Sequence, residues 1–73
     1  KLHILIIPKK PYIDVLDFLE NADSHYQSNF WISVNKIISQ LDLKNKGFQI
    51  KTHKGKDGGQ EVFHFHLHLL SDS

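Results

Sequence analysis

The sequence has no cysteine and no long apolar run, and each absence excludes a class of protein. Without cysteine, the chain can form neither a disulfide framework nor a thiolate metal site, which suits a reducing compartment. The longest uninterrupted apolar run, "ILII", is far shorter than the roughly 20 residues that cross a membrane as a helix. The first residues also differ from a signal segment, which is charged and then apolar. We therefore expect a cytoplasmic protein with no membrane partner.

An excess of charge of one sign is lacking as well. Nine Lys and Arg residues stand against eight Asp and Glu residues, so the sequence does not predict the basic surface that binds a nucleic acid polymer. A chain of 73 residues forms at most one small domain with a marginal core, which favours a stabilising partner. Because "KLHILIIP" enters a strand-like run with no turn before it, we expect residues 1–73 to be one partial domain, the C-terminal part of a larger one.

The clearest predicted element is a helix from about Ser24 to Asp42. Ser24 and Gln27 have the spacing of a capping box, and "KNKG" supplies lysines and a glycine beyond the end of the helix. Apolar residues recur at spacings of three and four and form one stripe, made of Phe30, Trp31, Val34, Ile37, Ile38 and Leu41. This stripe is a face that a sheet can cover.

Strand-like stretches lie on both sides of this helix in the sequence. The first is "LHILIIP", and two prolines end it before a loop or short helical turn from Ile13 to about Glu20. After the helix, "GFQIKTH" and "QEVFHFHLHLL" alternate in polarity on either side of the turn "KGKDGG", which predicts a hairpin. The predicted fold class is therefore α+β, with one main helix packed on an antiparallel sheet.

Alternation in the last strand separates its side chains onto two faces. The odd positions, which can pack on the helix, are Phe63, Phe65, Leu67 and Leu69, and the even positions are His64, His66 and His68. In a regular strand, neighbouring histidines lie about 6.7 Å apart and the outer two roughly 13 Å apart at Cα. The sequence thus predicts a row of imidazoles on the face away from the helix.

Three interpretations of this row are open. A zinc ion needs nitrogen ligands at about 2.0 to 2.1 Å in a tetrahedral cluster, which the outer two imidazoles could reach only by leaning steeply inward. The histidines could instead simply line a half-buried strand. Phosphoryl or nucleotidyl transfer fits better, because it needs a nitrogen nucleophile, a proton donor and a group that holds the tautomer. Gly58 and Gly59 add backbone N–H groups that could form an anion-binding nest.

The string "GGQEVFHFHLHLL" resembles the signature of the histidine triad (HIT) family, in which alternating histidines follow a Gly-Gln pair on the last strand. "HILIIPKK" is similar to the family's His-containing strand, and the helix, the "KGFQI" strand and the turn follow in the family's order. The resemblance covers nearly all of the chain and points to small nucleotide-binding hydrolases of bacterial type. It implies a HIT-like sheet and helix, no metal, no cofactor, and a purine nucleoside monophosphate as the bound nucleotide.

The resemblance also implies a role for each matching position. His66 would attack the α-phosphorus of a nucleoside phosphoramidate or related nucleotide conjugate and form a nucleotidyl-histidine intermediate. His68 would contact the phosphate and assist the leaving group, and His64 would orient its neighbours through hydrogen bonds. The residues expected to support the triad or bind the phosphate are His3, His53, Gly59, Gln60 and Glu61.

Two departures from the family pattern affect the function. His53 stands where the family usually has a phosphate-contacting Asn. The family's N-terminal helix and first strands, which carry the contacts to base and ribose, have no counterpart in this sequence, so activity is expected only of the full-length protein. Two function classes therefore stay open, a nucleotide hydrolase or transferase and a non-catalytic nucleotide-binding or interaction module that retains the triad.

A homodimer is the last expectation. The helix stripe includes Phe30 and Trp31 and exposes more apolar surface than one small sheet can bury. The resemblance implies a two-fold dimer in which the helix and the strand at 48–51 meet their own copies, with Trp31 near the interface. The alternative is that Trp31 completes the core of the monomer.

Overall fold

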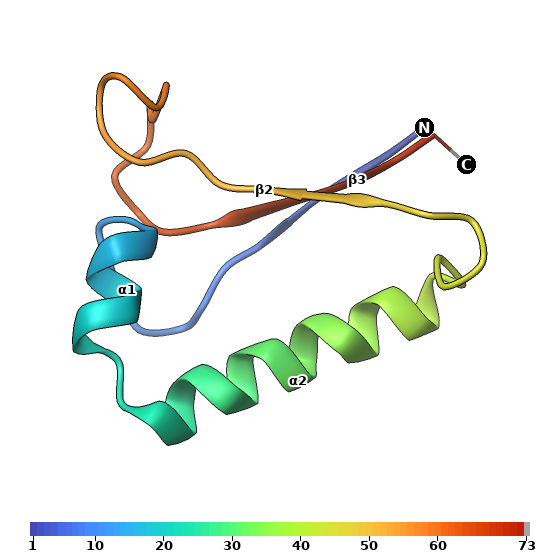
Figure 1. Ribbon diagram of the computed structural model, residues 1–73, viewed down its shortest axis with the longest axis horizontal. Helices are drawn as coiled ribbons and strands as arrows, with labels where there is room; N and C mark the ends of the chain where they lie inside the picture. Colours follow the sequence, from blue (N-terminus) through green and yellow to red (C-terminus); the bar gives the residue numbers. More distant parts are fainter. Residues whose placement is uncertain (73) are drawn as a thin grey trace.

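A three-stranded antiparallel sheet packs on one long helix in the computed structural model, which describes residues 1–72 (Figure 1). The elements follow in the order β1 (Leu2–Ile6), α1 (Val15–Asn21), α2 (Ser24–Gln40), β2 (Gln49–Lys51) and β3 (Leu67–Ser71). In the sheet the order is β1-β3-β2, so β3 is the central strand and pairs antiparallel with both neighbours. The predicted α+β fold class and the antiparallel pairing of the last two strands are confirmed.

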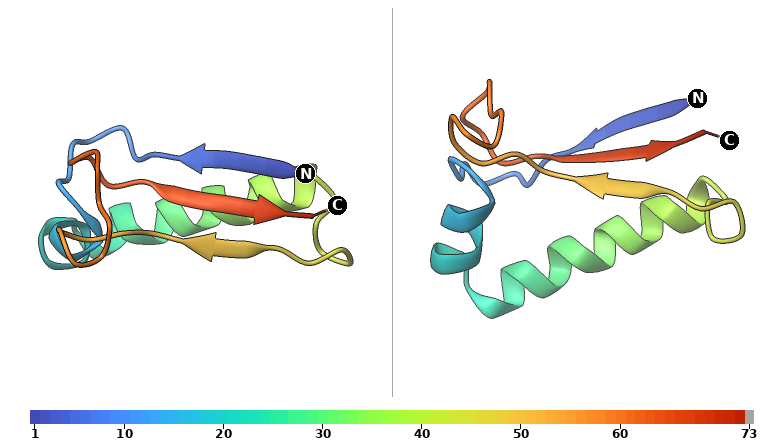
Figure 2. Two further views of the ribbon diagram at one scale, coloured as in Figure 1. Left: turned by 90° about the horizontal axis from the view of Figure 1, so that it is seen from above. Right: turned by 45° about the horizontal axis from the view of Figure 1, so that its top comes forward.

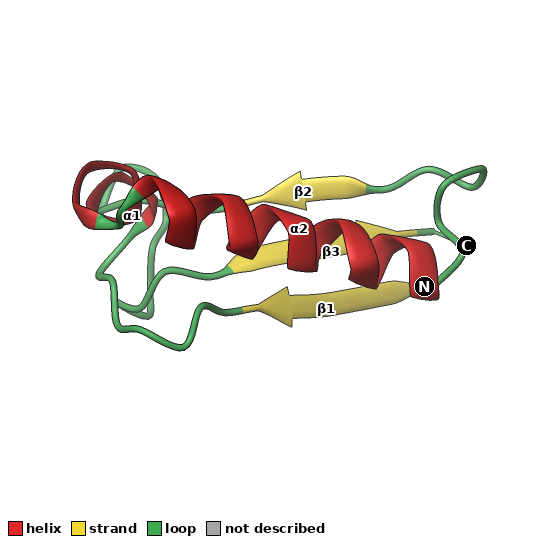
Figure 3. Ribbon diagram, turned by 90° about the horizontal axis from the view of Figure 1, so that it is seen from below, coloured by secondary structure: helices red, strands yellow, loops and turns green. Residues whose placement is uncertain are grey.

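Helix α2 covers one face of the sheet, and no element among residues 1–72 covers the other (Figures 2 and 3). The register fixes which side chains share a face, since directly paired residues in a sheet point to the same side. Leu69 pairs with Ile4 and Ile50 and is fully buried beneath α2. His68 pairs with Leu5 and Lys51, so the imidazole lies on the open face.

The core forms where the helix stripe meets the sheet. Its buried members on α2 are Phe30, Val34 and Ile38, and those on and before β3 are Phe65, Leu67 and Leu69. These positions were predicted to meet, and they do. Trp31 is 41% exposed and is not part of this core, so the alternative in which it completes the monomer core is wrong.

The start of α2 differs from the prediction. The N-cap is Asp23, whose carboxylate accepts a hydrogen bond of 2.8 Å from the backbone N–H of Tyr26. Gln27 does not complete a capping box with Ser24; its side-chain amide donates instead to carbonyl oxygens at the end of α1, including that of Ala22 at 3.0 Å. An acidic N-cap satisfies an otherwise unpaired N–H group as well as serine does, so the predicted starting residue is right although the capping residue is not.

The helix ends at Gln40, two residues earlier than predicted. Asp42 adopts φ +56°, the left-handed conformation that commonly terminates helices and that Asp tolerates better than most residues. Gly47, the glycine expected in that role, has φ +86° but lies further along, where its N–H bonds the carbonyl of Leu43. The chain therefore leaves the helix at Asp42 and turns toward β2 at Gly47.

Helix α1 occupies the stretch that was predicted as a loop or short helical turn. Asp14 caps it by accepting from the N–H of Asp17, and the Asp17 carboxylate accepts from the N–H of Ile13. The Asp17 carboxylate also accepts from the side chain of Asn21 at 2.6 Å. The bond from Ile13 and, to a smaller degree, that from Asn21 lower the pKa of Asp17. Phe18 on this helix is completely buried and stacks on Phe65 at 4.8 Å between ring centroids. Helix α1 thus contributes the centre of the aromatic core.

The last strand is shorter than predicted, because β3 begins only at Leu67. Before it, the N–H of Phe65 bonds the carbonyl of Tyr12 at 2.6 Å, and the hydroxyl of Thr52 bonds the carbonyl of His66 at 2.9 Å. The segment is therefore held by single bonds to two loops and not by a regular ladder. The prediction that Phe63 faces the helix is wrong, since its side chain is 65% exposed.

Candidate active site

A cavity of about 370 Å³ lies at the beginning of β3. The turn after β2 closes one side of it, and the histidine-bearing segment closes the other. The residues that line it are Leu5, His53, Gly59, Gln60, Glu61, Val62, His66 and His68. The structure therefore gathers most of the predicted site residues around one space, and it adds the apolar Leu5 and Val62, which no sequence pattern marked.

The ring of His66 is held in one orientation by the main chain. Its Nδ1 lies 2.6 Å from the backbone carbonyl oxygen of His64. A carbonyl oxygen only accepts hydrogen bonds, so Nδ1 must carry the proton of this pair. In the neutral ring, Nε2 then has a free lone pair, which is the form a nitrogen nucleophile requires.

His68 is the centre of a histidine cluster. Its Nδ1 lies 2.8 Å from Nε2 of His3 on β1, and its ring centroid is 5.0 Å from that of His66 and 5.3 Å from that of His53. Partial burial lowers the pKa of His68, and the neighbouring histidines and Lys51 lower it further by charge repulsion. His68 is therefore held neutral in the free site at neutral pH.

His64 acts through its backbone. The carbonyl of this residue, not its ring, makes the contact that orients His66. Ring atom Nε2 is buried with no hydrogen-bond partner among residues 1–72, and the side chain does not line the cavity. The hydrogen bond from His64 to its neighbour thus comes from the main chain, and the imidazole, which we expected to orient the other histidines, is not the group that makes it.

The glycine turn is shaped by its backbone requirements. Gly59 has φ +79°, a conformation that glycine adopts without strain. A Cβ on Gly58 would overlap the backbone carbonyl of Lys54, so this position also needs glycine. The turn is closed by a bond of 2.9 Å from the N–H of Gln60 to the carbonyl of Gly55.

Gln60 fixes this turn to the rest of the protein. Its side chain is only 8% exposed, and its amide oxygen accepts from the N–H of Gly55 at 2.8 Å. Its amide nitrogen donates to the carbonyls of Ile13 at 2.7 Å and Val62 at 3.1 Å. These bonds occupy the amide, so its side chain positions the turn and is not free to bind phosphate as the sequence led us to expect.

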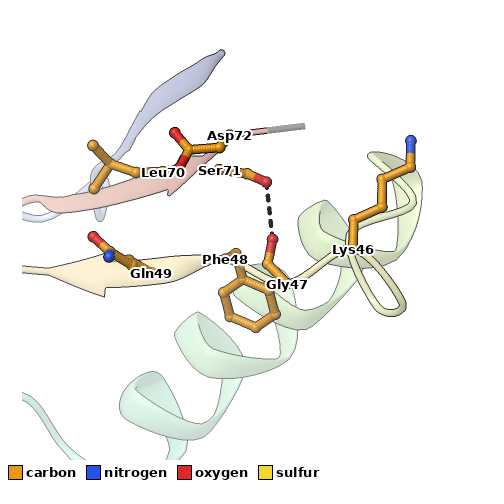
Figure 4. Close-up of a pocket in the computed structure, with 7 residues that line it drawn as sticks. All are labelled: Lys46, Gly47, Phe48, Gln49, Leu70, Ser71 and Asp72. Atoms are coloured by element: carbon orange, nitrogen blue, oxygen red, sulfur yellow. Dashed lines mark hydrogen bonds between the residues drawn. The ribbon is translucent and has the colours of Figure 1, made fainter.

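A second cavity, also about 370 Å³, lies at the opposite end of β3. It is lined by Lys46, Gly47, Phe48, Gln49, Leu70, Ser71 and Asp72. Figure 4 shows the Ser71 hydroxyl pointing to the carbonyl oxygen of Gly47, which it bonds at 2.8 Å, and the Lys46 side chain pointing away. This cavity has no imidazole, so it offers no nitrogen nucleophile at neutral pH.

Other classes of site find little support in the described part of the chain. Among residues 1–72, no group of three or more His, Cys, Asp or Glu side chains is arranged to hold a metal ion. Within the same residues, neither helix is long and apolar enough to cross a membrane. The histidine-lined cavity is thus the place where the chemistry of this chain is concentrated.

Comparison with known proteins fits this geometry. The family model of the HIT domain matches residues 1–73. The chain belongs to the HIT domain family. A HIT-like protein of Rickettsia prowazekii is 36% identical over 69 residues, which are 94% of this chain and 58% of that protein. This HIT chain therefore spans less than two thirds of that relative's length.

Solved HIT structures share the fold. A HIT family hydrolase from Clostridium thermocellum matches with a TM-score of 0.81 at 32% identity, covering 99% of this chain and 62% of the other. A histidine triad nucleotide-binding protein from Sulfolobus tokodaii matches with a TM-score of 0.68 at 32% identity, covering 94% and 45% respectively. The arrangement of sheet, helices and histidine segment is thus that of HIT proteins.

Proposed function

We propose that this HIT domain belongs to a nucleotide-binding hydrolase or transferase that cleaves nucleoside phosphoramidates or related nucleotide conjugates at the α-phosphate. The observation that carries the proposal is the fixed tautomer of His66, whose Nδ1–H is bonded to the His64 carbonyl. In the neutral ring this tautomer leaves a lone pair on Nε2, and His66 lines the cavity. The hydrolase and the nucleotide-binding protein among the structural neighbours add support from the family.

The first step is an attack by the Nε2 lone pair of His66 on the α-phosphorus. A bond forms between nitrogen and phosphorus, the bond from phosphorus to the leaving amine breaks, and the amine takes up a proton that His68 relays from solvent. The imidazole becomes positively charged, and the Nδ1–H bond to the His64 carbonyl stabilises that charge. The backbone N–H of Gly59 already donates to the carbonyl of Lys56 at 3.1 Å, contrary to its expected role, so we expect that of Glu61 to hold a phosphate oxygen.

The second step releases the nucleotide. Water attacks the phosphorus, the bond to Nε2 of His66 breaks, and a purine nucleoside monophosphate leaves. In a transferase another acceptor takes the place of water. His68, which lines the same cavity, accepts the proton of the attacking water and releases it to solvent when the nucleotide leaves.

The non-catalytic alternative shares every feature of binding but not the nucleophile. A module that only binds nucleotides does not need one imidazole nitrogen kept free of protons. The bond from His66 Nδ1 to a carbonyl therefore favours catalysis. No metal or cofactor enters either step.

The test is an assay of the full-length protein with adenosine 5′-phosphoramidate, following release of adenosine monophosphate. We expect turnover that persists after dialysis against a strong chelator. Nucleotide binding without turnover would support the non-catalytic alternative. If the chelator removed activity and zinc or manganese specifically restored it, the row of histidines would instead be a metal site.

We also propose that the protein acts as a homodimer. The support comes from apolar side chains left on the surface, with Trp31 and Phe48 each 41% exposed and Ile50 42% exposed. Strand β2 lies at an edge of the sheet, where a second copy of β2 can add by two-fold pairing. Sedimentation at micromolar concentration checks this, and a monomer there would contradict it.

A further inference from the structure

His53 lies in the loop that follows β2 and lines the histidine cavity. Its ring is tilted by 55° to that of His68, with the centroids 5.3 Å apart. The side chain is exposed, and within residues 1–72 its ring makes no hydrogen bond. Both ring nitrogens are therefore available to a ligand in the cavity.

From this geometry we propose that His53 binds the nucleotide phosphate as an imidazolium and takes up its proton when the nucleotide binds. The inference rests on the proposed function, because the phosphate is that of the nucleoside monophosphate. The consequence is a nucleotide affinity that rises as the pH falls. An Asn at this position, with an uncharged amide, has no such dependence.

The charges around the cavity explain why the proton arrives with the ligand. The titratable groups that line the cavity with His53 are His66 and His68 from the β3 segment and Glu61 from the turn, and the ring of His68 is in contact with that of His53. The following residue, Lys54, is paired with Asp14 at 3.7 Å. An unperturbed imidazole titrates at about 6.5 and is mostly neutral above that pH. A phosphate anion bound beside an imidazole favours its charged form, so the proton arrives with the ligand.

The other histidines of the cluster are less suited to this role. His66 has one nitrogen committed to the His64 carbonyl and the other to attack. His68 shares a hydrogen bond with His3, and burial as well as repulsion disfavours its charged form. His53 is the member of this cluster whose ring is free to gain a proton without breaking an existing bond.

The experiment is calorimetric titration of the full-length protein with adenosine monophosphate. Binding is measured for wild type and for His53→Asn at about pH 8 and about pH 6, on either side of the value where unperturbed imidazole titrates. The matched control is His25→Asn, because His25 is exposed on α2 and does not line the cavity. The titration of the ligand and of the shared histidines cancels in the ratio of affinities.

We expect the ratio of wild-type to His53→Asn affinity to grow by about tenfold from the higher to the lower pH, the size of one charge-assisted hydrogen bond. His25→Asn should follow wild type at both values. Repeating the titration in buffers of different ionisation enthalpy should show greater proton uptake by wild type than by His53→Asn. His53→Gln serves as a second uncharged variant if His53→Asn folds poorly.

Two outcomes overturn different parts of this account. An equal ratio at both pH values, with wild type binding the nucleotide, would overturn the role of His53 and leave the proposed function standing. Absence of nucleotide binding by wild type at either pH would overturn the proposed function, and the role of His53 with it.

Discussion

The two cavities at the ends of β3 have the same volume, about 370 Å³, but opposite chemistry. One collects His53, His66 and His68 beside a glycine turn. The other offers an amine, a carboxylate and the Ser71 hydroxyl, which is already bonded to the Gly47 carbonyl. The volume of a cavity therefore does not indicate its function, whereas the protonation states of the groups that line it do.

The open face of the sheet contributes side chains to both cavities. Alternate positions on and before β3 point to this face, and they carry His66 and His68 at one end and Leu70 at the other. Since the backbone is continuous, the difference comes from side-chain identity and from the loops that close each end. Four predictions sharpen or break the comparison.

The largest effect is expected for His66→Ala, which removes the proposed nucleophile. Turnover should fall by about a thousandfold or more, because no other group in the cavity has a tautomer fixed for attack. Nucleotide binding should remain largely intact. The matched control is Lys46→Ala in the second cavity, which should leave the hydrolysis rate unchanged. A large loss in the control, or none in His66→Ala, would remove the distinction between the two cavities.

The next effect is on stability. Gln60→Leu removes a buried amide that bonds Gly55, Ile13 and Val62, so it should lower the free energy of unfolding by about 1 to 3 kcal/mol. Ser71→Ala in the other cavity removes a hydroxyl bond and should cost about 1 kcal/mol or less. Urea denaturation measures both. If Ser71→Ala lowered the free energy of unfolding more than Gln60→Leu, the hydrogen bonds of the second cavity would contribute more to stability than those of the glycine turn.

A smaller effect concerns acid. Burial and neighbouring positive charges lower the pKa of His68 from its ordinary value of 6.5 in the folded protein. The unfolded chain then binds the proton more readily, so stability is full above pH 6.5 and declines as the pH falls below it. His68→Asn should flatten this decline. Asp17→Asn should not, because the pKa of Asp17 is lowered from 3.8 and its titration lies well below that window.

The smallest effect is expected for His64→Phe. The buried Nε2 atom of His64 has no hydrogen-bond partner within residues 1–72, so replacing the ring by an apolar one of similar shape should leave the unfolding free energy unchanged or raise it. The carbonyl that orients His66 remains, and turnover should keep most of its value. A marked loss of turnover in a stably folded variant would show that the imidazole contributes what we assign to the main chain.

Much of the fold was accessible from periodicity. Apolar spacing identified α2, and alternation identified the buried positions Phe65, Leu67 and Leu69, because burial on one side leaves a regular pattern. Helix α1 was predicted only as a loop or short helical turn, because only seven residues form it and its stability depends on Phe18 entering the aromatic core. Asp14 and Asp17 form the capping hydrogen bonds at the start of α1, and their spacing of three residues is a capping pattern that our sequence analysis did not use.

The residues of the site could be predicted from the sequence, but the hydrogen bonds that hold them could not. Alternation placed the histidines on one face, yet it also predicted a continuous strand, whereas the segment before Leu67 is held by contacts to Tyr12 and Thr52. Partners so distant in sequence leave no periodic signal. The buried role of Gln60 was hidden for the same reason, since its acceptor Ile13 lies far away along the chain.

The most direct test of the central claim is to trap the covalent intermediate. The full-length protein would be mixed with a nucleoside phosphoramidate, quenched within a single turnover under alkaline conditions and digested for mass spectrometry. The account predicts a nucleotidyl group on Nε2 of His66, absent from His66→Ala. A nucleotidyl group on another residue, or full turnover with no covalent adduct, would contradict it.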